Sequence, residues 1–114
     1  MTQEHATVTI HSAERGVSRK LVDSGEEGYQ AGETSKEFED GSELVYEGTY
    51  IQKDVGVAEI VEFSLYVGET LAEGYAVHHI IQKLEDTDFR LTINGDEVEP
   101  NEESIQTKLE EFKE

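Results

Sequence analysis

Hydrophobic and polar residues alternate over several short stretches of this chain, and the alternation predicts β-strands. In 5–12, alanine, valine and isoleucine occupy every second position, with threonine and histidine between them. A strict alternation of this kind is typical of a strand with one buried face. The chain then turns at Gly16, and we expect a short returning strand near 20–22 that completes a hairpin.

Two further strands are predicted over 43–53 and 57–67, where β-forming residues are abundant. In the first of these, Leu44 and Tyr46 define the more apolar face, and Gly48 marks a β-bulge. The second is the most hydrophobic stretch of the chain and has apolar residues on both faces. This pattern indicates a central strand that is covered at least in part on both sides.

The region 69–86 fits either a helix or a strand. A helix here begins with the capping box Thr70-x-x-Glu73 and carries Lys83 in its last turn, where a cation suits the helix dipole. Against it, Gly74 costs about 1 kcal/mol inside a helix, and several β-branched residues suit a strand. We favour the helix.

The C-terminal part of the chain has clearer local signals. Over 88–98, alternating apolar residues meet Asn94-Gly95, a strong hairpin signal because both turn positions need positive φ. Residues 101–114 then predict an amphipathic helix that Asn101 caps. Its apolar stripe consists of Ile105, Leu109 and Phe112.

These elements predict a single domain over 1–114 of the α+β class. We expect a mainly antiparallel sheet of four to five strands, one central helix and a C-terminal amphipathic helix. The segment 43–98 is similar to a β-grasp module in the order of its elements alone. The glycine-rich, acidic segment 24–42 predicts a long loose loop.

Charge then narrows the class of partner. The chain has 27 acidic and 9 basic residues and a net charge of −18, all of which arises from residue 24 onward. Such a field attracts basic proteins and repels nucleic acids and anionic membranes. We therefore expect a basic protein partner, no direct nucleic-acid binding and no membrane contact, and the oligomeric state stays open. The candidate contact residues are Glu37, Glu39, Asp40, Glu99, Glu102, Glu103, Glu110 and Glu111.

The sequence contains no recognisable catalytic, cofactor or metal motif. It has no cysteine, which excludes thiolate zinc sites and cysteine nucleophiles. His78 and His79 are adjacent, so their side chains point in different directions and do not readily share one ion. The helical pattern puts His78 on the apolar stripe, and we expect one histidine to be partly buried and the other exposed. The protein is therefore expected not to be an enzyme.

Two further sets of charges need a partner. Glu59 and Glu62 lie in the most hydrophobic strand, and Arg90 is the natural partner if either is buried. The basic residues of the first 23 positions are Arg15, Arg19 and Lys20. They suit either an anionic ligand or pairing with the acidic excess, and we expect the pairing.

Two functions follow from these expectations. The first is a small acidic inhibitor of a basic protein, in the manner of a DNA mimic or an immunity protein. The alternative is a domain from a salt-adapted organism, in which surface carboxylates serve solvation alone. The absence of cysteine and of a visible signal peptide favours the cytoplasm.

Overall fold

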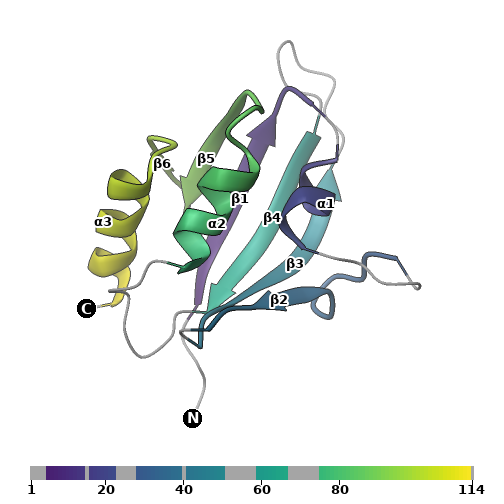
Figure 1. Ribbon diagram of the computed structural model, residues 1–114, viewed down its shortest axis with the longest axis horizontal. Helices are drawn as coiled ribbons and strands as arrows, with labels where there is room; N and C mark the ends of the chain where they lie inside the picture. Colours follow the sequence, from purple (N-terminus) through teal and green to yellow (C-terminus); the bar gives the residue numbers. More distant parts are fainter. Residues whose placement is uncertain are drawn as a thin grey trace.

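The computed structural model describes residues 5–14, 16–22, 28–39, 41–50, 59–66 and 75–113. Its strands are β1 (His5–Ser12), β2 (Ser35–Glu37), β3 (Glu43–Tyr50), β4 (Glu59–Tyr66), β5 (Phe89–Ile93) and β6 (Asp96–Val98). Its helices are α1 (Val17–Leu21), α2 (Tyr75–Lys83) and α3 (Glu102–Lys113). The strands form one antiparallel sheet in the order β2-β3-β4-β1-β5-β6 (Figure 1).

The α+β class is confirmed, but the described sheet has six strands rather than four to five, and three helices accompany it rather than two. The β-grasp order is not confirmed for 43–98. That range does not form a sheet of its own, because β1 from the start of the chain lies between β4 and β5. The strand β1 therefore joins β4 to β5 within the sheet.

The strand β4 is central, as its sequence predicts, and pairs with β3 on one side and β1 on the other. The register between β3 and β4 shifts at Gly48, which confirms the predicted bulge. The three helices pack on one face of the sheet (Figure 1), and on the other face of β4 Ser64 is buried, so the predicted coverage of that second face is partial. On the opposite face, Ile60 and Tyr66 stay partly exposed.

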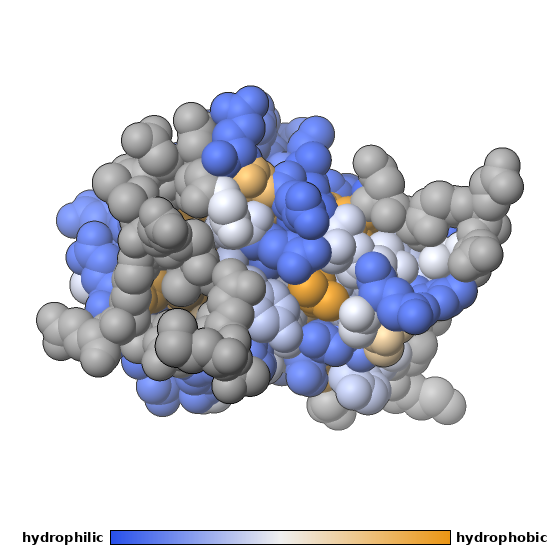
Figure 2. All heavy atoms as spheres, turned by 90° about the horizontal axis from the view of Figure 1, so that it is seen from below, coloured by the Kyte–Doolittle hydropathy of each residue, from blue (hydrophilic) through white to orange (hydrophobic). Residues whose placement is uncertain are grey.

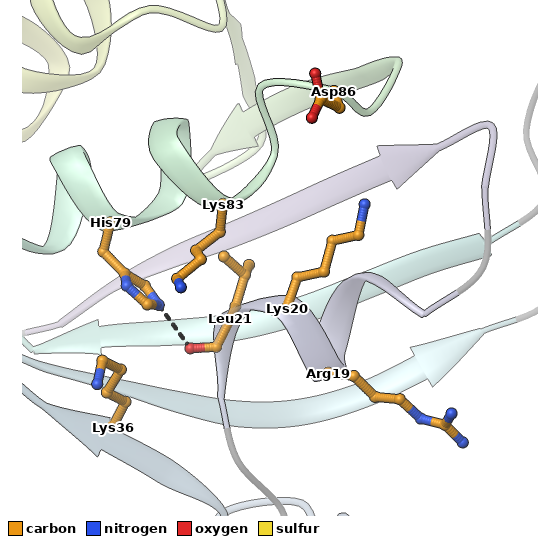
Figure 3. Close-up of a pocket in the computed structure, with 7 residues that line it drawn as sticks. All are labelled: Arg19, Lys20, Leu21, Lys36, His79, Lys83 and Asp86. Carbon is orange, nitrogen blue, oxygen red and sulfur yellow. Dashed lines mark hydrogen bonds between the residues drawn. The ribbon is translucent and has the colours of Figure 1, made fainter.

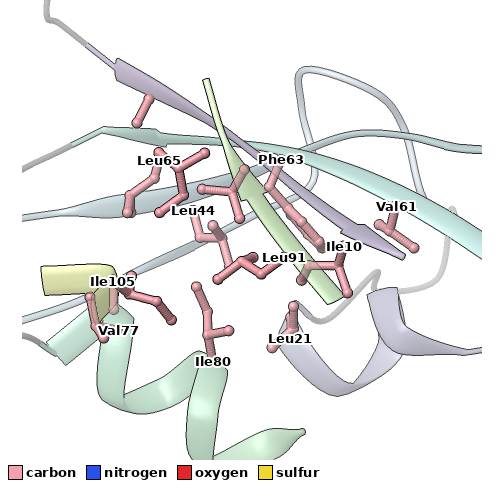
Figure 4. Packing of buried hydrophobic residues seen from close by; sticks show 14 of the residues in the cluster. Ile10, Leu21, Leu44, Val61, Phe63, Leu65, Val77, Ile80, Leu91 and Ile105 are labelled. Atoms are coloured by element: carbon pink, nitrogen blue, oxygen red, sulfur yellow. The ribbon is translucent and has the colours of Figure 1, made fainter. Parts of the chain in front are cut away.

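The core lies between the sheet and the three helices (Figure 4). Phe63 of β4 and Ile10 of β1 are fully buried and face Ile80 of α2. Ile105 and Leu109 of α3 are each 1 % exposed, which confirms the predicted stripe for these two residues. Burial of such a side chain contributes about 2 kcal/mol, so the pair anchors α3 to the core. The side chain of Phe112 lies outside the described residues.

The largest local difference from expectation is α1, which replaces the predicted returning strand near 20–22. Gly16, the residue directly before α1, has φ 91°. The buried carboxylate of Glu59 then accepts the backbone N–H groups of Gly16 at 3.2 Å and Val17 at 3.3 Å. These bonds satisfy donors that a helix start leaves unpaired, and they come from a strand 42 residues away.

This cap also overturns the predicted pairing of Glu59 with Arg90. Ser12 of β1 pairs with Glu59 of β4 on one side and with Phe89 of β5 on the other. These three residues therefore share a face of the sheet. Arg90 comes next after Phe89, so its side chain lies on the other face. Backbone amides, and not the guanidinium, therefore compensate the buried carboxylate.

The region 69–86 contains the helix α2, as favoured, whereas Thr70, Glu73 and Gly74 lie outside the described residues. The turn at Asn94-Gly95 is confirmed, with φ 52° and 87° at the two positions. In addition, the Asn94 side-chain oxygen accepts the Thr7 N–H at 2.9 Å, which ties this hairpin to β1.

Part of the predicted acidic loop 24–42 is described, and it contains the short strand β2 paired with β3. Tyr46 N–H donates to the Thr34 carbonyl at 2.8 Å, and Gly32 N–H donates to the Tyr46 carbonyl at 2.7 Å. These bonds fix the approach to β2. Among the described residues, no helix is long and apolar enough to span a membrane.

Candidate functional site

A groove of about 360 Å³ between β6 and α3 gathers part of the predicted acidic set. It is lined by Glu97, Val98, Glu99, Glu103, Ser104, Thr107, Lys108 and Glu111, and we call it the acidic groove. Glu99, Glu103 and Glu111 are three of the eight predicted contact residues. Sequence reasoning did not single out Glu97, although it belongs to the same run of charge.

The position of these carboxylates follows from how α3 starts and docks. The Asn101 side-chain oxygen accepts the Ser104 N–H at 2.8 Å, which confirms the predicted helix cap. Ile105 and Leu109 then face the core. The glutamates of α3 are exposed, so they stay in water beside the hairpin.

The cation in the acidic groove, Lys108, is already engaged by its neighbours. Its Nζ donates to Asp96 Oδ2 at 2.8 Å and lies 3.9 Å from Glu111 Oε2. The hydrogen bond from Lys108 lowers the pKa of Asp96, and the same bond raises the pKa of Lys108. Lys108 therefore offsets part of the charge and leaves Glu97, Glu99 and Glu103 without an ion-pair partner among the described residues.

Glu102 and Glu110 do not line the groove. Glu102 Oε1 lies 3.3 Å from His78 Nδ1, in an exposed contact between α3 and α2. His78 is thus exposed and His79 is partly buried, so the expectation of one histidine of each kind is confirmed. The placement of His78 on the apolar stripe is wrong, because His78 is exposed, whereas Val77 and Ile80 of the same helix face the core. Glu110 is exposed on the outer side of α3.

The remaining predicted acids are at the opposite end of the sheet. Glu37 lies in β2 and Glu39 follows it, whereas the acidic groove adjoins β6. Since β2 and β6 are the two edge strands, the predicted contact residues do not form one surface. Asp40 lies outside the described residues.

A second charged feature has the opposite sign. A pocket of about 490 Å³ lies between α1, β2 and α2 and is lined by Arg19, Lys20, Leu21, Lys36, His79, Lys83 and Asp86 (Figure 3). We call it the basic pocket. Among the described residues, its lining has four lysines and arginines and one acid.

Two hydrogen bonds hold the walls of the basic pocket. Lys20 Nζ donates to Thr87 Oγ1 at 2.6 Å, which links α1 to the turn after α2. His79 Nε2 lies 2.8 Å from the Leu21 carbonyl oxygen. Because a carbonyl only accepts, this nitrogen of His79 carries the proton. The rings of Phe38 and His79 pack edge to face, with centroids 5.2 Å apart.

Sequence reasoning found only part of this pocket. Arg19 and Lys20 belong to the predicted basic cluster, and Arg15 lies outside the described residues. The expected pairing of Arg19 and Lys20 with acids does not occur among the described residues. Lys36 and Lys83 lie far away in sequence, so only the folded chain brings the four cations together.

Within the described ranges, no group of three or more histidine, aspartate or glutamate side chains is placed to hold a metal ion. No protein-family model matches the chain, and no curated protein and no solved structure gave a match.

Proposed function

We propose that this protein is a non-enzymatic interaction module that binds a basic protein through the acidic groove. The observation that carries this proposal is that four carboxylates, those of Glu97, Glu99, Glu103 and Glu111, line one groove whose described lysine, Lys108, is already engaged by Asp96. In a chain of net charge −18, this groove is a place where a partner's lysine or arginine gains several carboxylates at once.

The spacing of the groove carboxylates supports a nucleic-acid-like arrangement. Glu97 lies in β6, and Glu99 follows two residues later. Pro100 restricts the backbone of Glu99 to extended conformations. Residues two apart in an extended chain share a face at roughly 6.6–7 Å, a distance similar to that between successive phosphates of one nucleic-acid strand. A DNA-binding protein is therefore the class of basic partner that we favour, with inhibition by occupancy of its DNA site.

The salt-adapted alternative draws on a different observation. Candidate acids lie at both edges of the sheet, and Figure 2 shows hydrophilic residues at both ends of one face of the molecule. Acids spread in this way are what solvation alone requires. Under this alternative the acidic groove has no preferred partner, and the fold loosens when salt falls below molar concentration. A cytoplasmic location stays a prediction under both functions.

A binding measurement with two matched variants separates the two functions. The probe is a fluorescent peptide of alternating lysine and arginine, titrated by anisotropy at low salt. The groove variant Glu99→Gln/Glu103→Gln/Glu111→Gln and the control Glu33→Gln/Glu37→Gln/Glu39→Gln each remove three exposed carboxylates. We expect the groove variant to bind the peptide about tenfold or more weakly than the control, since each lost contact is charge-assisted.

Equal affinity of the two variants would mean that net charge alone attracts the peptide, and it would remove the support for the acidic groove. Circular dichroism from low to molar salt tests the alternative in the same samples. A fold that is complete at low salt contradicts salt adaptation, whereas gain of structure only at molar salt contradicts the interaction module.

A further inference from the structure

The basic pocket inverts the composition of the chain. Overall, acids outnumber lysines and arginines by three to one, but the described residues that line the pocket include four such cations and one acid. If charged residues were placed at random on the surface of this protein, a pocket would be expected to carry a net negative charge. A compact concentration of positive charge on such an acidic protein therefore needs an explanation of its own.

Helix ends explain only part of this concentration. Arg19 and Lys20 lie in the last turn of α1, and Lys83 lies in the last turn of α2. Cations suit these positions because a helix C-terminus carries about half a negative charge. Lys36, however, comes from β2, where no helix end requires it. After Asp86 and the two helix ends are counted against the four cations, about two positive charges remain on the described lining residues.

The four cations of the basic pocket do not all point in the same direction. Figure 3 shows Lys83 and His79 descending from α2 toward the Leu21 carbonyl, with Lys36 opposite them on β2. Arg19 extends away along the rim, and Lys20 turns toward the region of Asp86. Lys36 and Lys83 are therefore the cations best placed to contact one bound group.

These cations are accessible, and Lys20 and Lys36 are also held in place. All four are exposed, and none forms an ion pair with a carboxylate among the described residues. Lys20 is oriented by its bond to Thr87, and Lys36 Nζ lies 5.7 Å from the centre of the Phe38 ring. His79 Nε2 hydrogen-bonds to the Leu21 carbonyl. This bond holds the imidazole in place between Lys83 and Lys36.

We propose that the basic pocket binds a compact phosphate-bearing small molecule with at least two negative charges. Lysines are effective phosphate ligands because each ammonium offers three donors and a full charge. The volume of about 490 Å³ falls in the range of small-molecule sites. Among the described lining residues, Leu21 is the one apolar side chain, so the pocket suits a polar, phosphate-rich ligand rather than an aromatic one.

A nucleic acid is a poor occupant of the same site. A polymer that leaves the pocket meets the acidic remainder of the protein, and a field of this sign repels phosphates over distances of about 10 Å at moderate salt. A small anion held by Lys36 and Lys83 stays inside the basic pocket and avoids this cost. Such a ligand binds independently of the acidic groove, which β6 and α3 form.

The test is a titration of the whole protein with pyrophosphate, followed by calorimetry and by amide NMR shifts. We expect saturable binding of pyrophosphate that is tighter than that of inorganic phosphate and of citrate. The largest shifts should fall at 19–21, 36 and 79–87. An absence of binding at millimolar pyrophosphate, shifts centred elsewhere, or equal affinity for citrate would each overturn the proposal.

Two variants of equal charge provide the control. Lys36→Gln/Lys83→Gln removes two cations from the basic pocket, whereas Arg90→Gln/Lys113→Gln removes two cations that are not among its described lining residues. We expect about a hundredfold loss of pyrophosphate affinity in the first and less than about threefold in the second. Equal losses would assign the binding to overall charge. If the first variant fails to fold by circular dichroism, the NMR shifts of the unmodified protein still decide.

Discussion

The acidic groove and the basic pocket differ in how the chain assembles them. The groove residues all fall within 97–111, one continuous stretch that forms β6 and α3. The pocket residues come from α1, β2, α2 and the turn after α2, which are spread over 19–86. Charge in the first case is a property of local sequence, and charge in the second is a product of tertiary structure. The comparison shows why a global count of −18 does not describe either site.

The two features also depend on different parts of the fold. Besides the neighbouring β6, α3 is held mainly by α2, and its buried residues are Ile105 and Leu109. The basic pocket instead depends on α1, which the carboxylate of Glu59 caps from β4. A substitution in the buried face of α3 should therefore affect the acidic groove, and a substitution of Glu59 should affect the basic pocket.

The largest expected effect is at the anchor of the acidic groove. Leu109→Ala should lower the free energy of unfolding by about 3 kcal/mol, because it empties a side-chain volume that is 1 % exposed. Urea unfolding followed by circular dichroism measures the loss. Glu110→Ala is the control, since an exposed neighbour should change stability by less than about 0.5 kcal/mol.

The same variant tests whether the two features are independent. Leu109→Ala should weaken peptide binding at the acidic groove and leave pyrophosphate binding at the basic pocket unchanged. An unaltered free energy of unfolding would contradict the docking of α3. A parallel loss of both ligands would show that the groove and the pocket share one cooperative unit.

The second effect is at the cap of α1. Glu59→Gln should lower the free energy of unfolding by about 2 kcal/mol, because it weakens charge-assisted bonds to the Gly16 and Val17 amides. Pyrophosphate affinity should fall with it, since α1 carries Arg19 and Lys20. Chemical unfolding and calorimetry measure the two changes. Glu62→Gln is the matched control, on the same strand but on its opposite face. An equal loss in that control would rule out the cap as the cause.

This cap illustrates what the sequence could not predict. The turn at Asn94-Gly95, the cap at Asn101 and the bulge at Gly48 depend on residues next to them, and all three predictions are confirmed. The helix α1 depends on a carboxylate 42 residues away, and no local pattern contains that information. The short strand β2 likewise forms by pairing with β3 in a segment that has few apolar residues.

The candidate sites follow the same rule. Glu99, Glu103 and Glu111 could be placed together because a predicted hairpin and helix are consecutive. Glu37 and Glu39 could not be separated from them, since the order of strands in the sheet is not visible in the sequence. The basic pocket was missed because Lys36 and Lys83 each look like an ordinary surface lysine until the fold places them around one space.

A smaller effect is expected at the start of the helix that carries the groove. Asn101→Ala should cost about 1 kcal/mol, because the Ser104 N–H loses its acceptor at 2.8 Å. Thermal unfolding measures the cost, and Asn101→Ser should restore most of it, since serine is also a good cap. Equal midpoints for the alanine and serine variants would contradict the capping role. Pyrophosphate binding should not change in either variant, because Asn101 is outside the basic pocket.

The smallest effect is a shift in titration inside the acidic groove. The hydrogen bond from Lys108 lowers the pKa of Asp96 below its ordinary value of 3.8 and raises the pKa of Lys108 above 10.5. The contribution of Asp96 to stability is thus present above pH 3.8 and is lost as the pH falls through its lowered pKa. The contribution of Lys108 is complete below pH 10.5 and is lost as the pH rises through its raised pKa.

Between these limits the ion pair should persist unchanged, so Lys108 offsets the same groove charge throughout the neutral range. Carboxyl-carbon NMR between pH 2 and 6 measures the Asp96 titration directly. Lys108→Gln should return the pKa of Asp96 toward its ordinary value, because both the donor and the charge are lost. Lys36→Gln removes the same charge from the basic pocket and should leave Asp96 unchanged. An equal rise in both variants would mean that overall charge, and not this hydrogen bond, sets the pKa of Asp96. The charges of the basic pocket would then act on the acidic groove, so the two features would not be electrostatically independent.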